Sequence, residues 1–62
     1  MMTGKDIRAI LDRLKMTQED FAEKLGVSQP TISAWLSGGR IVPAMAIHVR
    51  RTAEELAEKK AS

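Results

Sequence analysis

Uncharged hydrogen-bonding side chains, rather than acids or nucleophiles, are the most chemically informative residues of this 62-residue chain. Ten consecutive residues contain four hydroxyls and one long amide: Ser28, Gln29, Thr31, Ser33 and Ser37. A glutamine side chain can donate one hydrogen bond and accept another at the same time, which matches the N6 and N7 atoms of adenine. Gln29 is therefore our first candidate for contact with a base edge.

Catalytic and metal-binding chemistry is not indicated by the sequence. It contains no cysteine and a single histidine, His48, so a thiolate site and a histidine cluster are both excluded. Ser33, Asp20 and His48 do not have a spacing that favours a catalytic arrangement, and there is no phosphate-binding loop motif. We expect no catalytic residue, no metal ion and no cofactor.

A short helix over residues 18–25 is predicted to lie directly before the polar stretch. Thr17 is suited to cap its start, and Asp20 stands three residues later, where a capping-box acid lies. Gly26 can adopt the left-handed conformation that ends a helix at little steric cost.

A second short helix, over about residues 29–37, is predicted to carry the polar stretch. Ser28 is suited to cap it, and Pro30 falls in its first turn, where no amide hydrogen is needed. Ile32, Trp35 and Leu36 are spaced to face inward. The remaining residues then form a small, uncharged outer face: Gln29, Pro30, Ser33, Ala34 and Ser37.

This helix pair resembles the helix-turn-helix repressors of the lambda-repressor-like type, which include the XRE and phage Cro proteins. The residues that carry the resemblance are Gln18, Ala22, Gly26, Ile32, Trp35, the exit Ser37-Gly38-Gly39-Arg40, and Pro43. Ala22 is small enough for the helices to cross closely, and Ile32 fills the angle between them. The resemblance implies a domain that binds double-stranded DNA by placing its second helix in the major groove, about 12 Å wide.

The resemblance also implies which residues contact bases. They match Gln29, Pro30 and Ala34, and we include Ser33 from the same face of the helix. Ala34 would offer a methyl contact to thymine. Pro30 replaces a residue that is commonly polar in the family, so we expect few base hydrogen bonds and modest sequence discrimination.

Phosphate contacts are expected from the helix ends. The free N–H groups and positive dipole end at Gln18 can meet a phosphate. The resemblance implies the same role for Ser28 and Ser37, and we add Thr31 beside Ser28. Arg40, which follows two glycines, would be a flexible charge able to reach a phosphate or a base. For Gln18, Ser28 and Ser37 the alternative is ordinary helix capping and solvation.

Two further helices, over residues 4–14 and 44–60, are predicted to flank the pair. In the first, apolar residues recur at helical spacing: Ile7, Ile10, Leu11 and Leu14. In the second, no helix breaker follows Pro43, and the residues at helical spacing are Met45, Val49, Thr52 or Ala53, and Leu56. The prediction is therefore a single all-α domain of four helices covering residues 1–62.

The long last helix departs from the resembled family, in which a loop and a separate fifth helix usually follow. Its last two turns, with Ala53, Leu56 and Ala57, either form a solvated tail or pair with the same helix of a second copy. We expect a homodimer through residues 44–60, because one recognition helix touches few base pairs. Two-fold pairing would place the two recognition helices about 34 Å apart.

Charge is unevenly distributed although the net charge is only +2. All acids lie within residues 6–23 and 54–58, and the acid-free stretch over residues 24–53 carries four cations: Lys24, Arg40, Arg50 and Arg51. A phosphate backbone would fit this region, although a solvated surface is the alternative. Because no apolar run approaches the 18 or so residues of a membrane span, we expect no membrane contact and a cytoplasmic, nucleoid-associated protein.

These features favour a sequence-specific DNA-binding regulator, of the kind found as small repressors in prokaryotes and phages. The competing hypothesis is a protein-interaction module. In that case the last helix would bind a toxin or a protein antagonist, and DNA would be secondary.

Overall fold

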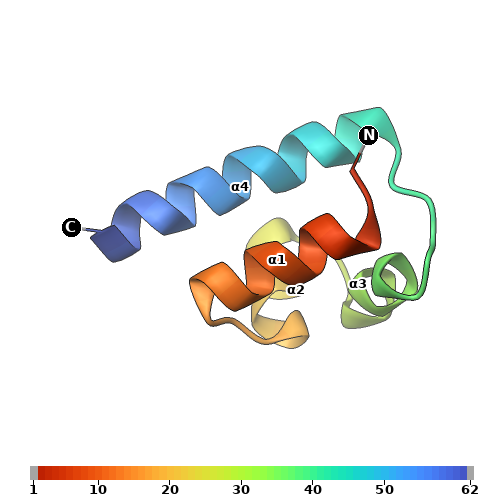
Figure 1. The fold of residues 1–62 in the computed structure, drawn as a ribbon, viewed down its shortest axis with the longest axis horizontal. Coiled ribbons are helices and arrows are strands. Elements are labelled where there is room, and N and C mark those ends of the chain that lie inside the picture. Colours follow the sequence, from red (N-terminus) through yellow and green to blue (C-terminus); the bar gives the residue numbers. More distant parts are fainter. Residues whose placement is uncertain (1, 62) are drawn as a thin grey trace.

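Four helices and three short connections make up the described part of the chain. The structure is a computed structural model that describes residues 2–61, with side chains described for residues 2–59. The helices are α1 (Gly4–Leu14), α2 (Gln18–Leu25), α3 (Gln29–Leu36) and α4 (Pro43–Ala61). No strand occurs in the part described. Figure 1 shows α4 extending across the molecule, with α1, α2 and α3 gathered on one side of it. The predicted all-α fold with a helix-turn-helix is confirmed.

The helix boundaries differ from the prediction by single residues. α3 ends at Leu36, one residue early, because Ser37 already has φ −85° and ψ 7° and forms the cap. α4 begins at Pro43, which needs no amide hydrogen there, and it continues to Ala61.

The starts of the helices are held by local hydrogen bonds. The N–H of Thr3 donates to Asp6 Oδ2 at 2.8 Å, and Thr17 Oγ1 accepts from the Asp20 N–H at 3.1 Å. Ser28 occupies the cap of α3 as predicted, but its hydroxyl pairs with the Thr31 hydroxyl at 2.9 Å instead of accepting from a backbone N–H.

The ends of α1 and α2 are both closed by a residue in the left-handed conformation. Gly26 has φ 82°, and the N–H of the following Val27 donates to the Ala22 carbonyl at 3.0 Å. At the end of α1 the same place is taken by Lys15, with φ 54°, a conformation that disfavours a residue with a Cβ.

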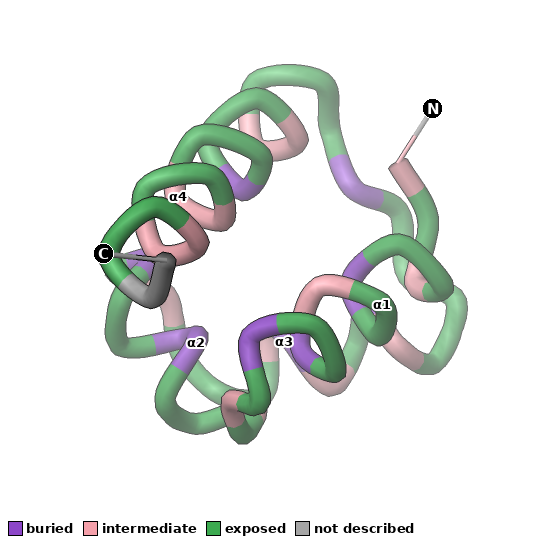
Figure 2. The backbone as a smooth tube through the Cα atoms, turned by 60° about the vertical axis from the view of Figure 1, so that its left-hand side comes forward, coloured by how far each residue is buried: buried purple, intermediate pink, exposed green. Residues whose placement is uncertain are grey.

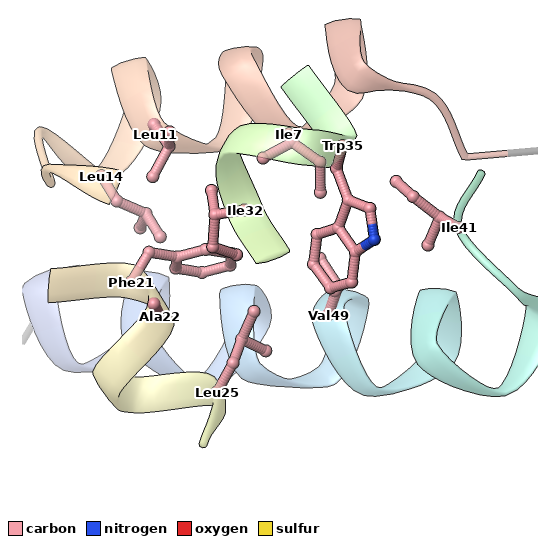
Figure 3. Close-up of a cluster of buried hydrophobic side chains, with 10 residues drawn as sticks. All are labelled: Ile7, Leu11, Leu14, Phe21, Ala22, Leu25, Ile32, Trp35, Ile41 and Val49. Atoms are coloured by element: carbon pink, nitrogen blue, oxygen red, sulfur yellow. The ribbon is translucent and has the colours of Figure 1, made fainter. Parts of the chain in front are cut away.

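The hydrophobic core lies in the space that the four helices enclose. Figure 2 shows the buried residues on the inward side of each helix, and the ten core side chains of Figure 3 converge there. They are Ile7, Leu11, Leu14, Phe21, Ala22, Leu25, Ile32, Trp35, Ile41 and Val49. Each helix supplies one side chain with no exposed surface: Ile7, Phe21, Ile32 and Val49. A chain this short has only one such core, and within it α3 is oriented mainly by packing against α1 and α2.

The segment of α4 over residues 53–57 packs against this core instead of projecting from it. Ala53, Leu56 and Ala57 are half-buried and pack against the core residues. Among the described side chains, the large apolar ones left exposed lie at the other end of the helix, where Val42 is 53% and Ile47 is 59% exposed. The unpartnered apolar surface therefore lies beside the loop that leaves α3.

Candidate nucleic-acid interface

The outer face of α3 is exposed and carries no charge. Ile32 and Trp35 are buried in the core, and the opposite side presents Gln29, Pro30 and Ala34 to solvent. Packing alone therefore fixes which side of α3 faces outward. A face of short side chains with one long amide can approach the edges of bases in a major groove.

Ser33 is placed differently from the other residues predicted on that face. It is half-buried, and its hydroxyl donates to Gln18 Oε1 at 2.9 Å. Gln18 is the first residue of α2 and is also half-buried. The predicted base-contact residue Ser33 and the predicted phosphate-contact residue Gln18 are thus joined to one another across the two helices.

The start of α2 offers more free backbone donors than the start of α3. In α2 the Asp20 N–H is taken by Thr17, which leaves the N–H groups of Gln18 and Glu19 without an intrahelical partner. In α3 the Thr31 N–H donates to the Ser28 carbonyl at 3.1 Å, and the second helical residue is a proline. An anion would therefore find more donors at the start of α2.

The exit from α3 is fixed where flexibility was predicted. The Gly39 N–H donates to the Ala34 carbonyl at 2.7 Å, and a Cβ on Gly39 would stand only 2.6 Å from that oxygen. The backbone before Arg40 is thus tied to the last turn of α3. Arg40 itself is exposed and has no partner among the described residues. The charged side chain of Arg40 therefore extends from a fixed backbone position near Ser37.

The cations of the acid-free stretch do not form one surface with α3. Lys24 and Arg40 belong to the helix-turn-helix segment, whereas Arg50 and Arg51 lie on α4, which packs mainly against α1 and α2. Arg50 lines a groove of about 540 Å³ between α1 and α4. The surface near α3 is therefore less cationic than the acid-free stretch of the sequence suggested.

The described residues give little support to metal binding, base stacking or membrane insertion. They contain no group of three or more side chains that could hold a metal ion. Trp35 is only 7% exposed and belongs to the core, so it is not available for stacking on a base. Within the same residues, no helix combines the length and hydropathy that a membrane span requires.

Comparison with known proteins identifies the family. The family model described as helix-turn-helix matches residues 7–47, which contain α2, the turn, α3 and the anchored exit. Neither the curated proteins nor the solved structures gave a match. The matched family is a DNA-binding regulatory one and not a catalytic one. The chain therefore belongs to the lambda-repressor-like helix-turn-helix family of DNA-binding transcription regulators.

Proposed function

We propose that this protein is a sequence-specific regulator that binds double-stranded DNA and reads the major groove with α3. The observation that carries the proposal is the exposed, uncharged face of α3, with Gln29, Pro30 and Ala34, in a chain of a DNA-binding family. Gln29 lies in the first turn of α3, the part of a recognition helix that contacts base edges. In this proposal Gln29 reads a base and Ala34 contacts a thymine methyl group.

The phosphate contacts in this proposal surround that face. Gln18 would bind one phosphate through its N–H and side chain, and Ser28 with Thr31 would bind another. Both hydroxyls of the Ser28–Thr31 pair are at the start of α3, and the pair leaves one hydroxyl hydrogen to donate. Ser37 and Arg40 would contact the backbone at the other end of the helix. A small prokaryotic or phage repressor is the type of regulator that fits this compact arrangement.

The decisive experiment is selection of binding sites from a random duplex pool, followed by a salt series on the winning duplex. We expect a defined sequence to be enriched and affinity to fall linearly on a log–log plot against salt. The slope should be about −0.9 for each phosphate neutralised. No enrichment over the starting pool, at any salt concentration that keeps the protein folded, would exclude the proposal.

We also propose that two copies bind one near-palindromic site through α4. A single eight-residue recognition helix contacts few base pairs, so two-fold pairing would supply the missing affinity. Val42 and Ile47 support a contact near the start of α4, because they are large, apolar and exposed. The symmetry of the selected site tests this part directly.

The α1–α4 groove favours a second candidate function, the binding of a protein antagonist or toxin. Its walls combine apolar side chains with charges of both signs, including Arg13, Arg50 and Glu54. Ala9 lines the groove and is exposed, so Ala9→Arg would fill it without disturbing the core. If a small protein encoded next to this gene binds the wild type but not Ala9→Arg, and DNA affinity is unchanged, the groove is a partner site. Equal binding to both proteins excludes the groove.

A further inference from the structure

The hydrogen bond between Ser33 and Gln18 joins the two helices of the interface. Ser33 lies in the middle of α3 and Gln18 begins α2, and the donor and acceptor oxygens are 2.9 Å apart. Both side chains are half-buried, so water competes less with this bond than with the exposed Ser28–Thr31 pair. Among the side-chain hydrogen bonds of the described residues, this one alone links α2 directly to α3.

The bond determines which end of the Gln18 carboxamide remains available. Its oxygen accepts from Ser33, so the NH₂ group, with two donors, is directed elsewhere and has no partner among the described residues. A DNA phosphate only accepts hydrogen bonds. A carboxamide rotated by half a turn would present its oxygen to that phosphate and would be repelled. The same bond uses the only hydrogen of the Ser33 hydroxyl, so Ser33 has no donor left for a base.

We propose that Ser33 is a positioning residue that orients the Gln18 carboxamide so that its NH₂ group donates to the DNA backbone. The inference rests on the proposed DNA-binding function and deepens it. It gives Ser33 a role different from the base contacts proposed for Gln29 and Ala34 on the same helix. A base-reading serine would act on one base pair. A serine that acts through Gln18 affects every duplex to the same extent, because phosphates carry no direct sequence information.

A double-mutant cycle of Ser33→Ala and Gln18→Ala tests the inference. We expect Ser33→Ala to weaken binding to the selected duplex roughly threefold to tenfold, the range of one hydrogen bond. In the Gln18→Ala background the same substitution should have no further effect. Base preference at every position should be unchanged. Independent, multiplying losses, or a changed preference at one base pair, would overturn the inference.

A third variant tests the orientation itself. Gln18→Glu retains an oxygen for Ser33 and replaces the NH₂ group by a charged oxygen, with nearly the same shape. It should bind DNA less tightly than Gln18→Ala, because a carboxylate beside a phosphate is repulsive. Binding equal to or tighter than that of Gln18→Ala would contradict the proposed direction of the NH₂ group.

Measurements on the free protein separate this inference from DNA binding as such. The ¹⁵N–¹H heteronuclear NOE of the Gln18 carboxamide should be high in the wild type and should fall in Ser33→Ala. Thr52→Ala, which removes another half-buried hydroxyl on α4, should leave both this NOE and DNA affinity unchanged. If the wild type binds no duplex, the proposed function fails. If it binds but the Gln18 carboxamide is already mobile, only the positioning role fails.

Discussion

His48 on α4 lies with its ring Nε2 2.7 Å from the carbonyl oxygen of Leu25, the last residue of α2. A carbonyl oxygen can only accept, so Nε2 carries the hydrogen and donates it. The last carbonyls of a helix have no partner within the helix. His48 supplies one from a distant part of the chain and joins α4 to the start of the turn between α2 and α3.

Removal of this bond should destabilise the protein. We expect His48→Ala to lower the free energy of unfolding by about 1 kcal/mol, the usual net contribution of one hydrogen bond. Urea unfolding followed through Trp35, the only tryptophan, measures the change. Arg51→Ala, an exposed position on the same helix, is the control and should stay within about 0.5 kcal/mol of the wild type. Equal stability of both variants would show that the bond contributes nothing.

Gly4 is required by close packing between α1 and α3. A Cβ at this position would stand 2.5 Å from the Trp35 carbonyl oxygen and 3.2 Å from the Leu36 Cα. We therefore expect Gly4→Ala to destabilise the protein by about 1–3 kcal/mol, although alanine favours helices more than glycine does. Thermal unfolding of Gly4→Ala and of the exposed control Lys5→Ala measures the difference. A more stable Gly4→Ala protein would mean that helix propensity outweighs this contact.

Lys15 is a position at which glycine should stabilise the protein, because the Lys15 backbone is in a conformation that glycine adopts more easily. Its φ of 54° ends α1, and the next N–H, of Met16, closes the turn on the Leu11 carbonyl at 3.0 Å. Lys15 is exposed, so its side chain can be removed without loss of packing. Lys15→Gly should raise the free energy of unfolding by about 1 kcal/mol. Lys15→Ala keeps the Cβ and should show no such gain.

Local signals in the sequence predicted most of the fold. Cap residues such as Thr17 and turn residues such as Gly26 act on neighbours three to five positions away, so their effects are visible in the sequence. The spacing of Ile32 and Trp35 likewise determined which side of α3 would be buried. These patterns predicted all four helices to within one residue at every end.

Contacts between distant residues could not be predicted in the same way. Ser33 and Gln18 are fifteen positions apart, and His48 and Leu25 are twenty-three positions apart. Nothing in the neighbourhood of Ser33 distinguishes a hydroxyl that bonds to another helix from one that faces solvent. The anchored exit was missed for a related reason, since a Gly-Gly pair indicates flexibility unless the Gly39 N–H has a partner.

Gln29 and Arg40 should affect DNA binding in different ways. Gln29→Ala is expected to cost about 1–3 kcal/mol on the selected duplex and to relax preference at one base pair, with little change in the salt dependence. Arg40→Ala should weaken binding to all duplexes and reduce the log–log salt slope by about one. Fluorescence anisotropy at four or more salt concentrations separates the two effects. If neither substitution changes affinity on selected or random duplexes, the protein-interaction function becomes the better explanation.

In the proposed pairing of two copies, the second copy would dock at the start of α4. Val42 and Ile47 are more than half exposed, whereas Leu56 and Ala57 at the far end pack on the core. Two large apolar residues are far fewer than the 20–30 residues per partner that a stable interface uses, a range that is approximate. We therefore expect the free protein to be monomeric and two copies to associate only when a duplex holds them side by side.

Ile47→Lys tests this association without disturbing the fold, because the side chain is 59% exposed. On a duplex with two half-sites about one helical turn apart, the wild type should bind cooperatively, and Ile47→Lys should bind the two half-sites independently. Affinity for an isolated half-site should not fall, since Ile47 is not part of the α3 face. Leu56→Ala is unsuitable as a control because it removes core packing, whereas Ile47→Val keeps an apolar surface and should retain cooperativity. Cooperative binding by Ile47→Lys would place the contact between copies elsewhere on the domain.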